Sequence, residues 1–126
     1  MYESICSKLN PENPWLAAER LVRKVERHGD DPFRSAILWH LLCSVVRHGE
    51  NNRLVRGRPP ALDDVQQHER ALEKIVQTGS VLVRRLDQRE VSLPGHYSRD
   101  NLRAMLTRAR FDLRLRRRKL MPLLKP

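Results

Sequence analysis

The sequence predicts an all-α fold, a small helical domain of four to five helices with an antiparallel N-terminal helical hairpin around a central apolar helix. Apolar residues recur at helical spacing in several separate segments of the chain. Glycine is scarce, at 5 of 126 residues, which leaves little of the turn chemistry that an all-β fold needs. A chain of this length is expected to form one domain over residues 1–126.

The central helix is predicted over residues 36–46, where only His40 and Ser44 are polar. These two residues lie four apart and share one helical face, so the segment is apolar almost all round. It is too short to span a bilayer, which takes about 20 apolar residues. Such a helix must be covered by other elements or by a second copy of the chain, so a homodimer is one interpretation of this segment.

The first helix is predicted to begin at Asn13 and Pro14, as an N-cap followed by proline, and to stop at Gly29. Asp31 and Pro32 then open the central helix in the same way. Because the connection between the two helices is so short, we expect them to form an antiparallel hairpin.

The central helix is predicted to stop at Gly49, since glycine favours the end of a helix. Residues 49–62 show no clear period and are predicted to form a long basic loop. A third helix then begins at Asp63 or Asp64. We favour a break at Gly79 and a short fourth helix after it, with one long helix over residues 64–89 as the alternative.

The last helix is predicted over residues 98–120, with Ser98 as its N-cap and Pro122 as its end. Nine basic residues from Arg99 to Lys119 face two acidic ones, so this segment holds +7 of the formal net charge of +10. Such a concentration is typical of proteins that bind phosphate-rich partners. The alternatives are a solvated helix face and an acidic protein partner. The candidate phosphate-binding residues are Arg103, Arg108, Arg110, Arg114, Arg116, Arg117, Arg118 and Lys119.

A second basic motif, Arg-Gly-Arg-Pro-Pro, occupies residues 56–60, with Arg53 just upstream. The motif resembles the core of an AT-hook, and its Gly-Arg-Pro part is similar to the arm of some site-specific recombinases. The resemblance covers only these few residues and implies that Arg56 and Arg58 enter the minor groove of A·T-rich DNA. Proline favours an extended backbone, and arginine is attracted to a narrow groove. The alternative is an ordinary loop that its two prolines stiffen.

Catalytic patterns are weak in this chain. The five histidines show no metal-ligand spacing, and no glycine-rich phosphate loop is present. His40 and Ser44 could pair as base and nucleophile, but no acid or oxyanion device accompanies them. The two cysteines, Cys6 and Cys43, make neither a disulfide framework nor a metal site. We therefore expect no catalytic residue, no metal and no cofactor.

The N-terminus lacks the basic and apolar pattern of a signal peptide, so a cytoplasmic location without a membrane partner is expected. The sequence then predicts a small non-enzymatic nucleic-acid-binding or accessory protein. Duplex DNA is the favoured partner, and RNA is the alternative nucleic acid. A different class of function is an adaptor or scaffold that docks an acidic protein or self-assembles through its apolar helix. An apolar patch beside the basic strip would favour that second class.

Overall fold

The computed structural model describes residues 14–55, 62–91 and 93–124, with residues 51–55, 62–64 and 119–124 described through their helical backbone alone. The described chain contains α-helices and one short 3-10 turn, with no strand, so the all-α prediction is confirmed. The elements are α2 (Pro14–Arg27), α3 (Pro32–Val55), α4 (Leu62–Arg89), the turn η1 (Gly95–Tyr97) and α5 (Arg99–Leu124).

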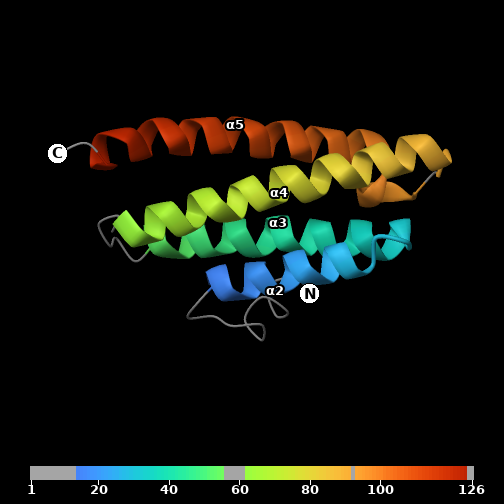
Figure 1. Cartoon of the computed structure of the whole chain (residues 1–126), viewed down its shortest axis with the longest axis horizontal. Helices are drawn as coiled ribbons and strands as arrows, with labels where there is room; N and C mark the ends of the chain where they lie inside the picture. Colours follow the sequence, from blue (N-terminus) through green and yellow to red (C-terminus); the bar gives the residue numbers. More distant parts are fainter. Residues whose placement is uncertain (1–13, 56–61, 92, 125–126) are drawn as a thin grey trace.

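Helix α4 is the shared element of the fold. It contacts α2, α3 and α5, while α2 and α3 also pack closely against each other. Helix α5 lies along α4 on the side away from α2, and η1 contacts both α3 and α5 (Figure 1). Helices α2, α3 and α4 thus form a cluster, and the basic helix α5 packs mainly against α4.

Polar side chains hold the connection between α2 and α3. The Ser35 hydroxyl is 3.2 Å from the carbonyl oxygen of Val25 and 3.1 Å from that of His28, and it can donate to either. It therefore serves carbonyls at the end of α2 that have no partner within the helix. The carboxylate of Asp31 accepts the Arg34 amide N–H at 3.1 Å, as expected for an N-cap. The predicted limits of the first helix and the start of the second are confirmed.

The predicted end of the central helix at Gly49 is wrong, because α3 continues to Val55. Gly49 is buried, and a Cβ atom at this position would lie 2.6 Å from the Pro14 ring. The glycine therefore admits the first residue of α2 rather than stopping a helix. Much of the predicted 49–62 loop is helical, and its remaining residues 56–61 lie outside the described part of the chain.

The predicted break at Gly79 is also wrong, since α4 is one helix of 28 residues. A Cβ atom on Gly79 would lie 2.6 Å from the indole ring of Trp39, so this glycine makes room for the largest core side chain. The neighbouring hydroxyl of Ser80 donates to the Val76 carbonyl oxygen at 2.7 Å within the helix. Both residues are thus accommodated without interrupting α4.

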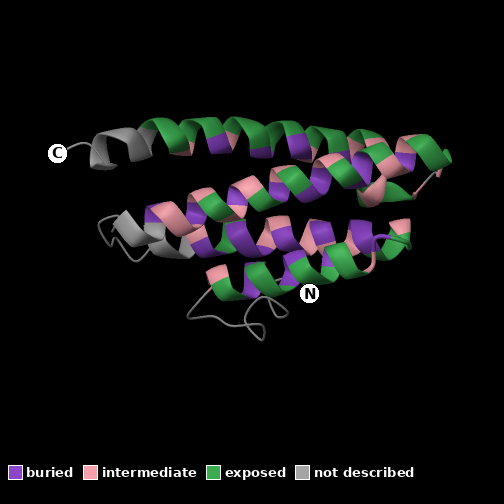
Figure 2. Ribbon diagram, viewed as in Figure 1, coloured by how far each residue is buried: buried purple, intermediate pink, exposed green. Residues whose placement is uncertain are grey.

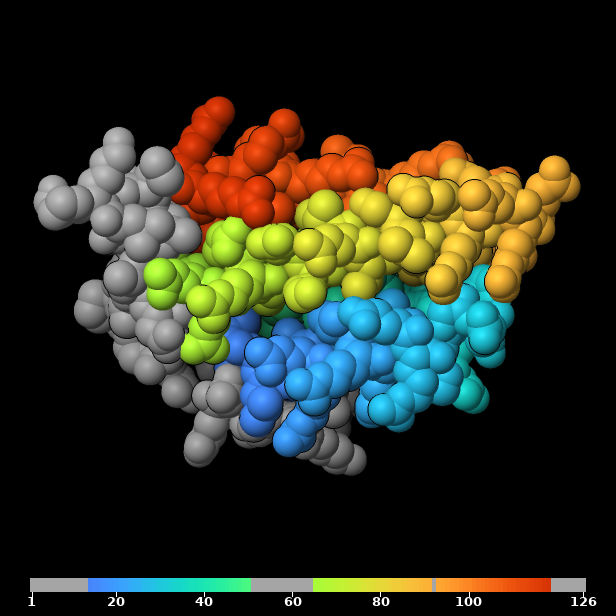
Figure 3. Space-filling model, in the orientation of Figure 1, coloured from blue at the N-terminus to red at the C-terminus, as the bar shows by residue number. Residues whose placement is uncertain are grey.

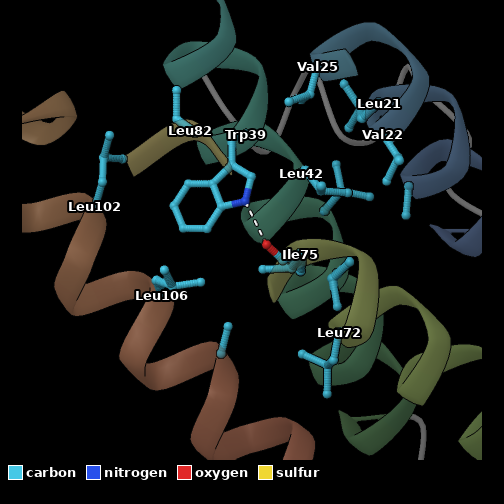
Figure 4. Close-up of a cluster of buried hydrophobic side chains, with 14 of the residues drawn as sticks. Leu21, Val22, Val25, Trp39, Leu42, Leu72, Ile75, Leu82, Leu102 and Leu106 are labelled. Carbon is cyan, nitrogen blue, oxygen red and sulfur yellow. Dashed lines mark hydrogen bonds between the residues drawn. The ribbon is translucent and has the colours of Figure 1, made fainter. Parts of the chain in front are cut away.

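The core is centred on Trp39, which is fully buried together with Leu42 and Leu102 (Figure 4) and with Leu86. The Trp39 indole N–H donates to the Ile75 carbonyl oxygen at 3.0 Å. This bond satisfies the one polar group of the indole ring and fixes α3 against α4.

Helix α5 begins where the sequence predicts. The Ser98 hydroxyl accepts the Asn101 amide N–H at 3.3 Å, and Asp100 lies in the first turn. The helix continues past the predicted end to Leu124, so Pro122 does not end it. Within the described residues, no helix has both the length and the apolar character to cross a membrane.

Candidate nucleic-acid interface

Helix α5 has one buried side and one solvated side. Leu102, Leu106 and Leu113 recur at helical spacing and are buried against the rest of the fold. The opposite side is exposed along the outer edge of the molecule, as the green surface of α5 in Figure 2 and the projecting side chains in Figure 3 show. The exposed arginines of this helix are Arg103, Arg108, Arg110, Arg114, Arg117 and Arg118.

Three of these arginines take part in ion pairs at the surface. Arg103 pairs with Asp87, Arg108 with Asp112, and Arg117 with two glutamates of α4. The arginine side chains of these pairs remain 52%, 69% and 51% exposed. Such pairs contribute about 0–1 kcal/mol each, so a phosphate group can compete for these guanidinium groups.

Arg116 differs from its neighbours because its side chain is only 13% exposed. Its Nη2 atom donates to the Glu50 carboxylate at 2.9 Å, which joins α5 to α3. The other carboxylate oxygen of Glu50 lies 3.6 Å from Nδ1 of His68 on α4. Arg116 thus takes part in a contact between helices, rather than facing the solvent with the other predicted phosphate-binding residues.

Arg110, Arg114 and Arg118 form a row on the exposed side of α5, which we call the arginine row. Residues four apart share a helical face, and the row extends over about 12 Å. Within the described chain, Arg114 and Arg118 form no ion pair, and Arg110 donates to the Ser80 hydroxyl at 3.1 Å. These guanidinium groups have most of their donors available to a partner.

A shallow cleft of about 380 Å³ between α4 and α5 adjoins the arginine row. Arg84, Arg103 and Arg110 line it together with the hydroxyls of Ser80 and Thr107. Arg84 is not among the residues predicted from the sequence, because its segment was assigned from its inward-facing apolar residues alone. The signal was the pair of adjacent arginines in α4, of which Arg84 is exposed.

The side chains of the remaining predicted binding residues lie outside what the structure describes. Arg56 and Arg58 lie outside the described residues, so the AT-hook resemblance stays a prediction. Arg53 and Lys119 are described only through the backbone of α3 and α5.

The serine of the central helix uses its hydroxyl for a contact with the helix backbone. The Ser44 hydroxyl donates to the carbonyl oxygen of His40 at 3.1 Å, a contact common within helices. The His40 ring packs edge-on against Tyr97, 5.5 Å between ring centroids. Burial, followed by the positive charges of His96 and Arg47, lowers the pKa of His40.

Cys43 illustrates how burial suppresses reactivity, because desolvation raises the pKa of its thiol from 9.0 to about 12. The thiolate is the nucleophile, so about a thousandfold less of it is present near pH 8 than for a thiol of ordinary pKa. In a Cys6→Ser variant, which leaves Cys43 as the single thiol, we expect iodoacetamide to alkylate the native protein about a thousandfold more slowly than the urea-unfolded protein. Mass spectrometry over time measures both rates, and equal rates would contradict this burial effect.

Searches against protein-family models, curated proteins and solved structures found no match to this chain.

Proposed function

We propose that this protein binds nucleic acid through the solvated side of α5, with duplex DNA as the favoured partner. The observation that carries the proposal is the arginine row, exposed and next to a cleft that two further arginines line. Guanidinium groups in such an arrangement suit phosphate oxygens, because each offers a planar fork of donors. The binding energy would come mainly from the release of counterions from the nucleic acid.

The proposal includes the finer points of the sequence analysis. The antiparallel hairpin around the central apolar helix would act as the scaffold that supports α4, and α4 in turn supports α5. The protein would act in the cytoplasm and would not catalyse a reaction. Arg56 and Arg58 would add contacts in the minor groove of A·T-rich DNA.

The test is the binding of a fluorescently labelled DNA duplex across a salt series. Five phosphate contacts, one each from Arg84, Arg103 and the three members of the arginine row, predict a slope of log K against log salt of about −4.5. A slope near zero, or no binding at low salt, would contradict the proposal. The same titration with an RNA duplex tests the preference for DNA. Equal affinity for the DNA and RNA duplexes would contradict that preference.

A second candidate function is an adaptor or scaffold that docks an acidic protein or self-assembles. Phe111 is 52% exposed and Leu115 is 41% exposed on α5, so apolar surface lies beside the arginine row. An aromatic residue exposed in this way is a common anchor of protein interfaces. Sedimentation equilibrium tests self-assembly: a dimer that Phe111→Ser converts to a monomer would favour this candidate.

A further inference from the structure

A groove of about 410 Å³ lies between α3 and α5, with α4 as its floor. Its apolar lining includes Leu72 and Ile75 from the floor, Val46 from α3, and Met105 and Ala109 from α5. Four of these five residues are buried, and Met105 together with the 41% exposed Leu115 of α5 supplies the more accessible apolar lining. The volume is in the range that small-molecule sites occupy, and such sites combine apolar walls with a few charged groups.

Side-chain contacts between α3 and its neighbours limit the length of the groove. At one end, Arg116 of α5 binds Glu50 of α3 at 2.9 Å. Toward the other end, one turn before Cys43, the ring of His40 packs against Tyr97 of η1, which contacts both walls. The ten helical rises from His40 to Glu50 correspond to about 15 Å. An occupant must therefore be short, unlike a protein helix or strand that continues past either end.

The rims of the groove carry positive charge. Arg47 lines it from α3 and Arg108 from α5. Arg47 is exposed and forms no ion pair with any described residue. Among the residues that the structure describes, Arg108 pairs with Asp112 of its own helix, at 3.2 Å, and such an exposed pair is easily exchanged for another anion. The acid deeper in the groove, Glu50, is already bound by Arg116. The groove therefore offers cations at its rims above an apolar floor.

We propose that this groove binds a medium-chain aliphatic carboxylate. The carboxylate would accept hydrogen bonds from Arg47 and Arg108, and the hydrocarbon chain would lie on Met105 and Leu115, above the buried Leu72 and Ile75. Charge complementarity selects an anion, the apolar floor selects a hydrocarbon chain, and the blocked ends set its length. The site is separate from the arginine row, because Arg108 and Arg110 are two residues apart and point about 160° apart around α5.

The first experiment titrates the full chain with decanoate below its micellar concentration. Calorimetry gives the affinity, and NMR of protein labelled at its three methionine methyl groups gives the location. We expect saturable binding that shifts the methyl resonance of Met105 and not those of Met1 and Met121. Decyltrimethylammonium, which has the same chain and the opposite charge, should bind at least tenfold more weakly, and so should acetate. Equal binding of the ammonium compound, or an unchanged Met105 resonance, would overturn the proposal.

Charge-reversed variants complete the test. Arg47→Glu/Arg108→Glu should weaken decanoate binding at least tenfold, because both donors become repulsive. The matched control, Arg110→Glu/Arg114→Glu, removes the same charge from the other side of α5 and should leave decanoate binding unchanged. Equal weakening in both variants would indicate a general effect of net charge and overturn the site. The outcome does not depend on nucleic-acid binding, because decanoate binding is measured with no nucleic acid present.

Discussion

The variant Trp39→Ala should lower the free energy of unfolding by about 4 kcal/mol, the range found when large aromatic residues are removed from cores. Trp39 is fully buried, and its indole N–H donates to the Ile75 carbonyl oxygen at 3.0 Å. Its removal leaves a cavity where α3, α4 and α5 meet (Figure 4). Urea denaturation followed by circular dichroism measures the loss, and a loss under 1 kcal/mol would contradict this role.

The partner variant Gly79→Ala tests the contact itself. Replacing glycine by alanine within a helix usually stabilises it by about 1 kcal/mol. Here we expect destabilisation, because the new Cβ atom would lie 2.6 Å from the Trp39 ring. In the Trp39→Ala background the same change should be neutral or stabilising, since its obstacle is gone. If Gly79→Ala had the same effect in both backgrounds, the two residues would not be coupled.

The second large effect concerns the arginine row. The triple variant Arg110→Glu/Arg114→Glu/Arg118→Glu should reduce affinity for a DNA duplex at least a hundredfold at low salt. It should also reduce the magnitude of the salt slope by about 2.7, since three phosphate contacts are lost. Titration of a labelled duplex with the wild type and the variant, at several salt concentrations, measures both quantities.

A matched control separates position from net charge. Arg20→Glu/Arg23→Glu/Lys24→Glu reverses three exposed residues of α2 and changes the net charge by the same amount. This variant should keep the wild-type salt slope and lose much less affinity, because α2 lies on the far side of α4 from α5. Similar losses in the two variants would mean that DNA responds only to overall charge, and the arginine row would not be an interface.

The sequence was sufficient for the helical class because apolar periodicity is a local property. It was insufficient for three helix ends, two assigned to glycines and one to Pro122. Gly49 and Gly79 neither cap nor break a helix. Gly49 leaves space for the ring of Pro14, and Gly79 leaves space for the ring of Trp39. Whether a glycine ends a helix or accommodates a neighbour depends on which residue packs against it, and that residue lies 35 or 40 positions away in the chain.

The same limit applies to the candidate interface. A run of basic residues in the sequence identifies the charge of a helix but not the direction of each side chain. Arg116 belongs to the run but binds Glu50, which is 66 residues earlier, while Arg84 lies outside the run but lines the cleft beside it. Both differences depend on how α5 packs against α3 and α4. The spacing of residues within α5 does not determine that packing.

The attachment of α5 mainly to α4 has a consequence for the order of folding during synthesis. Helices α2, α3 and α4 make their mutual contacts within the first 89 residues, before α5 has left the ribosome. Until then, the surface of the nascent chain that later receives Leu102, Leu106 and Leu113 remains exposed. During that interval the emerging chain presents an exposed apolar surface, which the cationic last helix then covers.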